Sequence, residues 1–336
     1  MRPAEFDLIA RIRARAGRMQ SMQSMQRGGV VLGIGDDAAL LQIPAGMQLA
    51  VAMDTLNAGV HFPEATAPAN IGWKALAVNL SDLAAMGALP AWCTLSLSLP
   101  EADAGFVEGF LDGFLALAAQ HDVALVGGDT TRGPLSVCVT VHGFIEPGQA
   151  LHRDGACVGD EVWVSGTLGD AAGALAQATK KTKEGQVHVA EAREPDSLLR
   201  ARLDRPTPRI ALGRALRGIA HACIDVSDGL LADLGHVCTA SGVGAQIDVD
   251  QLPASRALRM AFDPEQRRAL QASGGDDYEL CFSAAPDAHA AVLAAAAEAC
   301  TVVTRIGVTT TGVGVIASDA GGSPWSAATS GWIHFG

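Results

Sequence analysis

Residues 135–142 read Leu-Ser-Val-Cys-Val-Thr-Val-His, and apolar and more polar side chains alternate along them with a period of two. This alternation is typical of a strand with one buried face. Residues 50–54 and 91–99 also have the pattern of strands, whereas residues 68–86 and 103–120 have helical patterns. Strands and helices therefore alternate over about the first 145 residues, which predicts an α/β unit built around one sheet.

A break in this pattern near Glu146-Pro-Gly148 marks the expected boundary between two domains, residues 1–148 and 149–336. A length of 336 residues suits two domains, each large enough for its own core. The second domain is predicted to be α/β as well, with strands at 161–165, 221–226 and 243–249 and helices from Asp170 and Asp228. Carboxylates stand where strands of both domains end, which is where open α/β sheets bind ligands.

Four other segments carry their own predictions. The repeated Ser-Met-Gln at 18–26 is of low complexity and is predicted to be a mobile loop. Residues 180–204 are charged and are predicted to form a variable loop, after which Pro206-Thr-Pro-Arg209 opens a helix with proline in its first turn. The alanine-rich run after Pro286-Asp287 is predicted to be a capped, buried helix, too short to span a bilayer.

Composition restricts the class of protein. The chain has 24 Lys plus Arg against 36 Asp plus Glu, a formal net charge of −12, and 49% of its residues are hydrophobic. It is too apolar to be disordered, and its acidity argues against a non-specific binder of nucleic acid or anionic membranes. Seven cysteines without a CxxC pair, and an N-terminus without the apolar core of a signal peptide, indicate a cytoplasmic protein with reduced, buried thiols.

Aspartates lie beside Gly, Ser or Thr at the ends of several predicted elements, and each taken alone is common turn or cap chemistry. Two cases are less ordinary. Asp82 lies in an apolar helical run with Asn79 on the same face, where a carboxylate is costly unless a cation pairs with it. Asp225 and Asp228 flank Ser227 at a strand-to-helix turn, so both can face one pocket.

Carboxylate oxygens without His or Cys clusters favour Mg²⁺ over zinc or iron. Mg²⁺ commonly joins carboxylates to phosphates, so this pattern indicates phosphoryl-transfer or nucleotide chemistry. Gly127-Gly128 would let backbone amides approach a phosphate group. The chain has no G-x-x-x-x-G-K-[ST] motif, no protein-kinase motif set and no third glycine after Gly33-x-Gly35, so a P-loop or Rossmann enzyme is not expected.

Taken in order, these motifs resemble those of the thiamine-monophosphate kinase family, over about residues 5–335. The matching segments are Gly33-Ile-Gly-Asp-Asp37, Asp54-Thr-Leu with Gly59-Val-His-Phe62, Asn79-Leu-Ser-Asp82, Gly127-Gly-Asp-Thr130, Pro206-Thr-Pro-Arg209, Asp225-Val-Ser-Asp-Gly229, Gly275-Asp-Asp-Tyr-Glu-Leu280 and Trp332-Ile-His-Phe335. The superfamily includes aminoimidazole ribonucleotide synthetase and selenophosphate synthetase. The resemblance implies a two-domain, synthetase-like α/β (α+β) fold, in which the N-terminal mixed sheet pairs with that of a dimer mate and a C-terminal α/β domain completes the substrate site.

The resemblance also implies a reaction: ATP and thiamine phosphate give ADP and thiamine diphosphate, with several Mg²⁺ ions, in thiamine diphosphate biosynthesis. By motif matching, the metal ligands would be Asp37, Met53, Asp54, Asp82, Asp129, Asp225 and Asp228, with Asp82 shared between ions. ATP would contact Gly128, Asp129, Arg153 and Ser227, and thiamine phosphate would contact His61, Asp276 and Trp332. Without the resemblance, His61 would be interpreted as a structural histidine and Trp332 as part of the core.

Two positions depart from the family's pattern. Ala52 and Met53 stand where hydroxyl residues are usual, so a metal contact there survives only if it uses the Met53 backbone carbonyl. Asp276 stands where glutamate is usual, which keeps the charge and shortens the reach by one methylene. Either change can alter affinity without altering the reaction.

No general base is expected, because the attacking phosphate oxygen has a pKa near 6 and is already largely anionic at neutral pH. The transfer would then depend on alignment and charge neutralisation. Two alternatives stay open. One is another ATP-using enzyme of the superfamily, such as a selenophosphate synthetase, although its reactive Cys or selenocysteine near the N-terminus is missing and the first cysteine is Cys93. The other is a non-catalytic nucleotide- or metal-binding regulator, which Ala52 and Met53 alone support.

Overall fold

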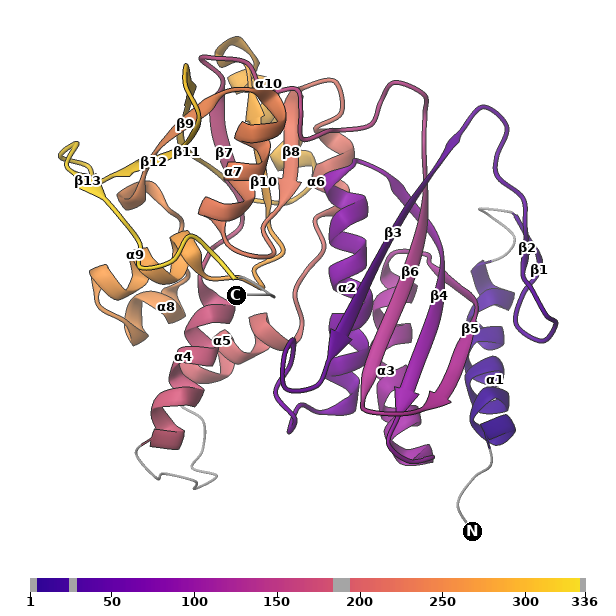
Figure 1. The fold of residues 1–336 in the computed structure, drawn as a ribbon. Helices are drawn as coiled ribbons and strands as arrows, with labels where there is room; N and C mark the ends of the chain where they lie inside the picture. Colours follow the sequence, from indigo (N-terminus) through magenta and orange to yellow (C-terminus); the bar gives the residue numbers. More distant parts are fainter. Residues whose placement is uncertain (1–4, 24–28, 184–193, 333–336) are drawn as a thin grey trace. The chain divides into compact units, whose positions relative to one another are not determined.

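The computed structural model describes residues 5–23, 29–183 and 194–332, and the chain forms two compact units (Figure 1). The N-terminal unit comprises residues 1–83 and 88–150, and the C-terminal unit comprises residues 84–87 and 151–336. Both units combine helices with sheets, so the mixed α/β fold predicted from the sequence is confirmed.

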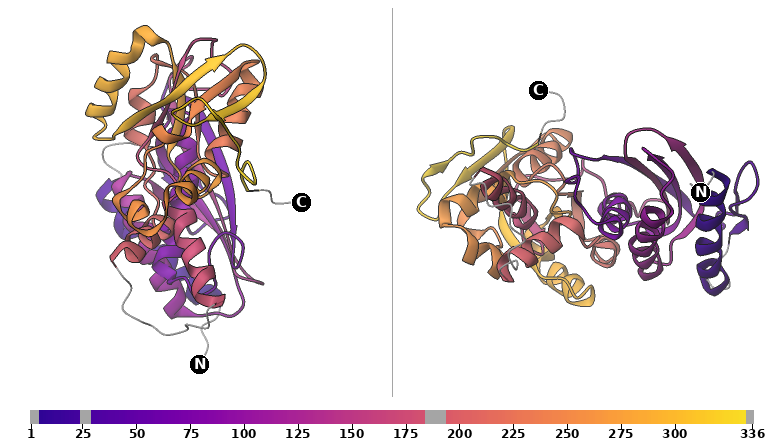
Figure 2. Two further views of the ribbon diagram at one scale, coloured as in Figure 1. Left: turned by 90° about the vertical axis from the view of Figure 1, so that its left-hand side faces the viewer. Right: turned by 90° about the horizontal axis from the view of Figure 1, so that it is seen from below.

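A mixed four-stranded sheet of order β3-β6-β4-β5 forms the N-terminal unit, and only β4 and β5 are parallel. Its strands are β3 Gln48–Asn57, β4 Leu89–Leu99, β5 Ala124–Arg132 and β6 Ser136–Ile145. Helices α2 Pro68–Ala85 and α3 Ala104–Gln120 cover one face (Figure 2). The two helices cross closely because position 113 is glycine: a Cβ there would lie 1.7 Å from the carbonyl oxygen of Ala69.

The face of this sheet away from α2 and α3 carries exposed apolar side chains. Leu49, Val51 and Met53 alternate along β3 and are 39%, 55% and 62% exposed. Strand β3 is also an edge strand of the sheet. We call this surface the open face.

Two predictions for the N-terminal unit are wrong in part. A second small sheet, β1 Val30–Leu32 with β2 Leu40–Leu41, accompanies the main one. Helix α1 Glu5–Gln23 extends into the repeated Ser-Met-Gln segment, so residues 18–23 are helical, and residues 24–26 lie outside the described residues. Leu8, Ile12 and Ala16, four residues apart, are buried along α1, and Met and Gln are good helix formers.

The C-terminal unit contains a seven-stranded sheet of order β13-β12-β9-β11-β7-β10-β8, antiparallel except for the β12–β9 pair. Its strands are β7 Glu161–Ser165, β8 Ala220–Asp225, β9 Gly244–Asp248, β10 Leu280–Ala284, β11 Val303–Thr310, β12 Gly314–Ser318 and β13 Pro324–Trp325. The helices are α4 Asp170–Lys183, α5 Glu194–Asp204, α6 Ile210–Ala215, α7 Leu230–Ser241, α8 Arg256–Ala261, α9 Pro264–Ser273 and α10 His289–Glu298, with short 3₁₀ turns η1 Val249–Gln251 and η2 Pro286–Ala288. Side chains of β7, β8 and α7 share one buried apolar cluster.

Three predictions for this unit need correction. The loop expected at 180–204 is wrong at both ends, because α4 reaches Lys183 and α5 occupies 194–204; residues 184–193 lie outside the described part of the chain. Residues 206–209 precede α6 instead of forming its first turn, and Arg209 is its N-cap residue. Helix α10 exists, but it has no side-chain cap and buries only one face, while its Leu293 is 47% exposed.

The cysteines are free, as predicted. Their expected burial holds for Cys93, Cys223, Cys238 and Cys281, but Cys157 and Cys300 are exposed. Among the helices that the structure describes, none is long and apolar enough to cross a membrane.

Candidate functional site

The turn between β8 and α7, residues 225–229, carries three of the predicted site residues, and we call it the aspartate turn. Asp225 ends β8 and is 4% exposed, whereas Ser227 and Asp228 are half-buried. The backbone N–H groups of Ser227, Asp228 and Gly229 donate to Oδ2 of Asp233, at 3.0, 3.1 and 3.1 Å. One buried carboxylate in the first turn of α7 therefore fixes the shape of the aspartate turn.

The electrostatics of this turn favour a bound cation. Burial raises the pKa of Asp233 to about 7, and the negative charges of Asp225 and Asp228 add to the rise, while the backbone N–H donors of Gly229 and Asp228 oppose it. The negative charges of Asp225 and Asp228 thus disfavour ionisation of the Asp233 carboxyl. Oxygen donors in this arrangement fit Mg²⁺, whose charge would relieve the repulsion.

Two predicted substrate residues meet the aspartate turn through their backbones. The N–H of Asp276 donates to the carbonyl of Ser227 at 2.8 Å, and the N–H of Trp332 donates to the carbonyl of Asp228 at 2.9 Å. The hydroxyl of Tyr278 donates to Oδ1 of Asp276 at 3.1 Å. Trp332 is 56% exposed, so it is not a core residue. The structure therefore gathers Asp225, Ser227, Asp228, Asp276 and Trp332 into one cluster.

Arg153 does not join this cluster. Its carbonyl accepts a hydrogen bond of 2.9 Å from the hydroxyl of Ser241, the last residue of α7. The aspartate turn immediately precedes the first residue of the same helix. Because 12 residues of helix span about 18 Å, the backbone of Arg153 lies at the opposite end of α7 from the aspartate turn.

In the N-terminal unit, Asn79 links Asp54 to the helix that carries Asp82. Asn79 is fully buried in α2, where its Nδ2 donates to the carbonyl of Ala75 at 2.9 Å and its Oδ1 accepts from the N–H of Asp54 at 2.8 Å. Asp82 is half-buried and lies one helical turn further along the same face. The structure thus holds Asp54 beside the α2 face predicted for metal binding.

The strand register separates Asp129 from Asp54. Each row of the register crosses all four strands: Asp54, Val139, Leu95 and Gly128 form one row, and Thr55, Cys138, Ser96 and Asp129 form the next. Successive rows of a pleated sheet point to opposite faces. The carboxylates of Asp54 and Asp129 are therefore not brought to one face, and Asp129 belongs to the row that faces away from α2 and α3.

Gly128 has a structural reason to be glycine that the sequence did not reveal. Its φ is +150°, and a Cβ there would lie 1.8 Å from the carbonyl oxygen of Leu95 on β4. At Gly127 the nearest atom to such a Cβ is a methyl of Thr94 at 3.9 Å. Close packing of β4 and β5 thus accounts for Gly128, and Gly127 is the more open of the pair.

His61 and Asp37, two further predicted residues of this unit, lie in turns or bends. Nδ1 of His61 accepts from the N–H of Asn57 at 3.0 Å, so this neutral imidazole carries its proton on Nε2. Asp37 is exposed, and its N–H donates to Oδ1 of Asp36 at 2.9 Å. The Met53 side chain lies on the open face, so only its backbone carbonyl is left to serve as a ligand.

Sequence reasoning missed several buried charges beside the predicted residues. Lys74 is 2% exposed in α2, and its Nζ donates to the carbonyl of His61 at 2.9 Å. Asp277 is buried, which raises the pKa of its carboxyl, and it accepts from the N–H of Gly169 at 2.7 Å. A charged residue within an apolar run was the signal available for Lys74 and for Asp233.

Glu279, within the same Gly-Asp-Asp-Tyr-Glu-Leu motif, is fully buried and anchors the segment after Asp276. Arg209 forms a forked pair with it, from Nε at 2.6 Å and Nη2 at 2.5 Å, and Arg202 adds a contact of 2.7 Å. Burial opposes the charge of Arg209, but the hydrogen bonds to Glu279 and the attraction of its negative charge together outweigh burial and raise the pKa of Arg209. The backbone carbonyl of Glu279 accepts from the N–H of Val226 at 2.7 Å, which ties this ion pair to the aspartate turn.

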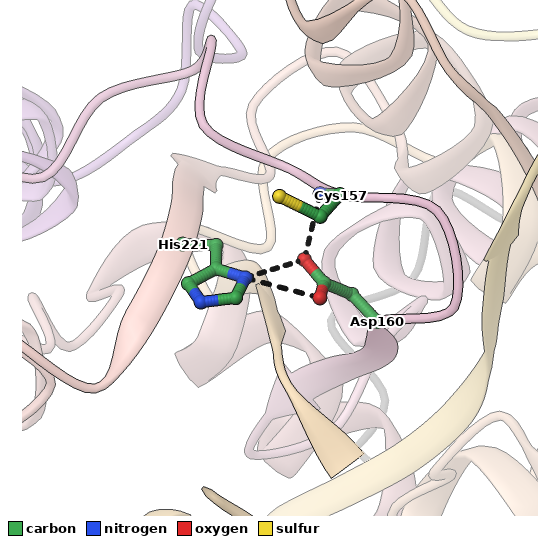
Figure 3. A group of neighbouring side chains, drawn as sticks. All are labelled: Cys157, Asp160 and His221. Carbon is green, nitrogen blue, oxygen red and sulfur yellow. Dashed lines mark hydrogen bonds and ion pairs between the residues drawn. The ribbon is translucent and has the colours of Figure 1, made fainter.

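A group of mixed metal-ligand types lies elsewhere in the C-terminal unit, at Cys157, Asp160 and His221 (Figure 3). One ligand atom of each lies within 4.8 Å of the others. Buried Asp160 already accepts from Nδ1 of His221 at 2.9 Å, the N–H of Cys157 at 2.9 Å and the hydroxyl of Ser283 at 3.1 Å. These bonds satisfy the carboxylate and hold the 157–160 turn against β8 and β10.

Comparison with known proteins identifies the family of this chain. The family of AIR synthase related proteins matches with its N-terminal domain over residues 35–145 and with its C-terminal domain over residues 158–319. The thiamine-monophosphate kinase of Salmonella typhimurium is 47% identical over 320 residues, which is 95% of this chain and 92% of that protein.

Two solved structures extend the comparison. The crystal structure of thiamine-monophosphate kinase from Stenotrophomonas maltophilia K279a is 54% identical, with a TM-score of 0.84 over 92% of this chain and 96% of that chain. AaThiL complexed with AMPPCP and TMP is 31% identical, with a TM-score of 0.71 over 92% of this chain and 95% of that chain. The resemblance inferred from the motifs is thereby confirmed, and this chain belongs to the thiamine-monophosphate kinase family.

Proposed function

We propose that this chain transfers the γ-phosphoryl group of ATP to thiamine phosphate, giving ADP and thiamine diphosphate. The observation that carries this proposal is the cluster in which the aspartate turn meets Asp276 and Trp332 through two backbone hydrogen bonds. The curated relatives that share this chain nearly end to end are thiamine-monophosphate kinases, and AaThiL has been solved with an ATP analogue and TMP. Transfer of a phosphoryl group from ATP to thiamine phosphate uses both kinds of ligand that the AaThiL complex contains.

Mg²⁺ is the cofactor that this donor set fits. Bound Mg²⁺ supplies charge neutralisation of the phosphates and of the carboxylates. In the C-terminal unit its ligands would be Asp225 and Asp228, and in the N-terminal unit Asp54 and Asp82 beside Asn79. The motif matches add Asp37, Asp129 and the backbone carbonyl of Met53 to this set.

The chain's own residues would position and orient the reactants. Asp233 holds the aspartate turn rigid through three N–H donors, so its side chains need no rearrangement when substrate binds. Exposed Trp332 offers an aromatic face for a thiamine ring, beside the Asp276 carboxylate. A phosphate oxygen is the nucleophile, so no side chain has to remove a proton.

The other assignments rest on chemistry rather than on contacts. Gly128 and Ser227 would present backbone or hydroxyl groups to ATP, and His61 would face thiamine phosphate. We retain Arg153 as an ATP contact because a guanidinium forks onto phosphate oxygens. The free cysteines support the cytoplasmic location expected from the sequence.

We also propose a homodimer formed through the open face. Leu49, Val51 and Met53 would be covered there by a second sheet, and burial of apolar surface stabilises association. Asp129, in the row that shares this face, would then approach the partner. Val51→Asp is expected to yield monomers by analytical ultracentrifugation, whereas Val313→Asp, at an 89% exposed loop position, leaves the dimer intact. A Val51→Asp protein that sediments as a dimer would contradict this interface.

The selenophosphate synthetase alternative finds no support in the described thiols. Cys93, the first cysteine, is fully buried in β4, and burial raises the pKa of its thiol far above the ordinary value. A nucleophilic cysteine needs access and a depressed pKa.

A coupled assay of ADP release, with ATP, Mg²⁺ and thiamine phosphate, tests the proposed function. Turnover that requires thiamine phosphate supports it. ATP binding without turnover would instead indicate a regulator, and turnover only with another acceptor would indicate a different activity within the superfamily.

A further inference from the structure

The C-terminal unit contains a pocket of about 1040 Å³ that none of the proposed site residues lines. Its walls come from α5, α8 and α9 and from the segments that precede α4, α6 and β11. Pockets that bind small molecules usually measure about 300–1,000 Å³, so this one is large enough for a nucleotide-sized ligand.

Arginines dominate the charge of this pocket, although the chain as a whole has a net charge of −12. Seven arginines line it: Arg202 in α5, Arg205 and Arg209 between α5 and α6, Arg256 and Arg259 in α8, and Arg267 and Arg268 in α9. The acidic residues among its lining are Asp170 and Asp250. We call it the arginine pocket.

Carboxylates neutralise only part of this charge. Arg202 and Arg209 are paired with Glu279, and Arg268 is paired with Asp250 at 2.5 Å. Within the described ranges, the guanidinium groups of Arg256 and Arg267 have no hydrogen bond or ion pair, and Arg259 donates only to the backbone carbonyl of Ala254. Three positive charges therefore line the pocket without a carboxylate partner among the described residues.

Arg267 adds an independent sign that a ligand is needed. Its Nε is buried and has no hydrogen-bond partner within the described part of the chain. A buried N–H without an acceptor is costly, and native proteins rarely tolerate one. A small shift of the Arg267 side chain would bring this N–H to a phosphate oxygen in the pocket, since guanidinium and phosphate geometries match.

The apolar part of the lining indicates that the anion carries an organic group. Leu198, Leu252 and Val302 contribute apolar surface to the same pocket, and Leu198 and Val302 are 52% and 73% exposed. A bare inorganic anion would leave this surface in water, whereas a ring system would cover it.

We propose that the arginine pocket binds an organic phosphate, a ring-bearing molecule with one or more phosphate groups, through Arg256, Arg259 and Arg267. The pocket shares no residue with the aspartate turn, so this binding does not depend on the proposed kinase activity. Because the pocket supplies its own positive charge, the ligand binds without a divalent cation, unlike a nucleotide at a cluster of carboxylates.

Isothermal titration of the full chain with ADP, in buffer containing EDTA, tests this. We expect saturable binding that weakens with salt and that Arg256→Gln/Arg267→Gln weakens about tenfold or more, since hydrogen bonds to charged groups are the strong ones. Arg214→Gln, an exposed arginine of α6 outside the pocket, is the matched control and should bind as the unmodified chain does. No binding without metal, or equal affinity in the double variant, would overturn the proposal.

Inorganic pyrophosphate provides the second arm of the titration. It is expected to bind at least several-fold more weakly than ADP, because it cannot cover Leu198 and Leu252. Equal affinities would refute the organic part of the proposed ligand. Kinase turnover with Mg²⁺ is measured on the same variants, so a failure of the arginine pocket is distinguishable from a failure of the proposed activity.

Discussion

The aspartate turn and the arginine pocket lie in the same unit and have opposite charge. In the aspartate turn, burial and the negative charges of Asp225 and Asp228 raise the pKa of Asp233, and under our proposal a cation binds there together with the anionic substrate. In the arginine pocket, three guanidinium groups have no carboxylate partner among the described residues, and under our proposal they bind an anion directly. The net charge of −12 therefore does not predict which ligand either region binds. The local arrangement of charges decides this.

Glu279 lies between these two regions, so its replacement should have the largest effect. Glu279→Gln would leave the mostly buried Arg209 without its countercharge and Arg202 with the Asp170 carboxylate at 4.0 Å, which we expect to lower the free energy of unfolding by about 3–5 kcal/mol. Denaturant titration measures this. Glu265→Gln is the control, because Glu265 is 70% exposed beside Arg268 and its loss should cost no more than about 0.5 kcal/mol. Equal stability of the two variants would show that the buried pair does not hold the regions together.

Asp228→Asn should damage the aspartate turn alone. Loss of one charged ligand is expected to lower kcat about a hundredfold or more, while the free energy of unfolding changes by less than about 1 kcal/mol because the residue is half-buried. Metal-free ADP binding at the arginine pocket should stay unchanged. Asp287→Asn, an exposed position outside both regions, serves as the control. Near-normal turnover of Asp228→Asn would remove this residue from the metal site.

Asp82→Asn extends the same test to the N-terminal unit. If Asp82 is a shared metal ligand on α2, kcat should again fall about a hundredfold or more, with little change in unfolding. Asn79 remains to hold Asp54, so the fold should be preserved. Circular dichroism and a thermal melt check the fold, and a variant that turns over normally would contradict a shared metal site.

Trp332→Ala should have the smallest effect. If the exposed indole stacks on the thiamine ring, the KM for thiamine phosphate should rise about fivefold while kcat changes little, because one aromatic contact is worth about 1 kcal/mol. Trp332→Phe, which keeps an aromatic face, should recover most of the affinity. An unchanged KM in the alanine variant would mean that the ring binds elsewhere.

The two regions also differ in how far the sequence predicts them. Asp225, Ser227 and Asp228 lie within four consecutive residues, so a local motif is enough to bring them together. The arginines come from three separate helices, α5, α8 and α9, and from the segment between α5 and α6, and only tertiary packing makes them neighbours. The same reason explains why Cys157, Asp160 and His221, 64 positions apart at the extremes, were missed.

Strands and helices were predictable where the sequence pattern follows the buried face, as in the alternation of residues 135–142 and the helical pattern of residues 68–86. Strand order and register were not, and register is what places Asp129 and Asp54 in successive rows. The repeated segment at 18–23 was mistaken for a loop because low complexity hides a helix whose apolar residues lie earlier, at Leu8 and Ile12.

Transfer of label from [γ-³²P]ATP tests the central claim most directly. With Mg²⁺ and thiamine phosphate, the chain should place the label in thiamine diphosphate, with one ADP formed for each molecule labelled. A thiamine-dependent direct transfer gives no labelled inorganic phosphate beyond background. Label appearing in inorganic phosphate, or ADP formed without labelled thiamine diphosphate, would contradict the proposed kinase reaction.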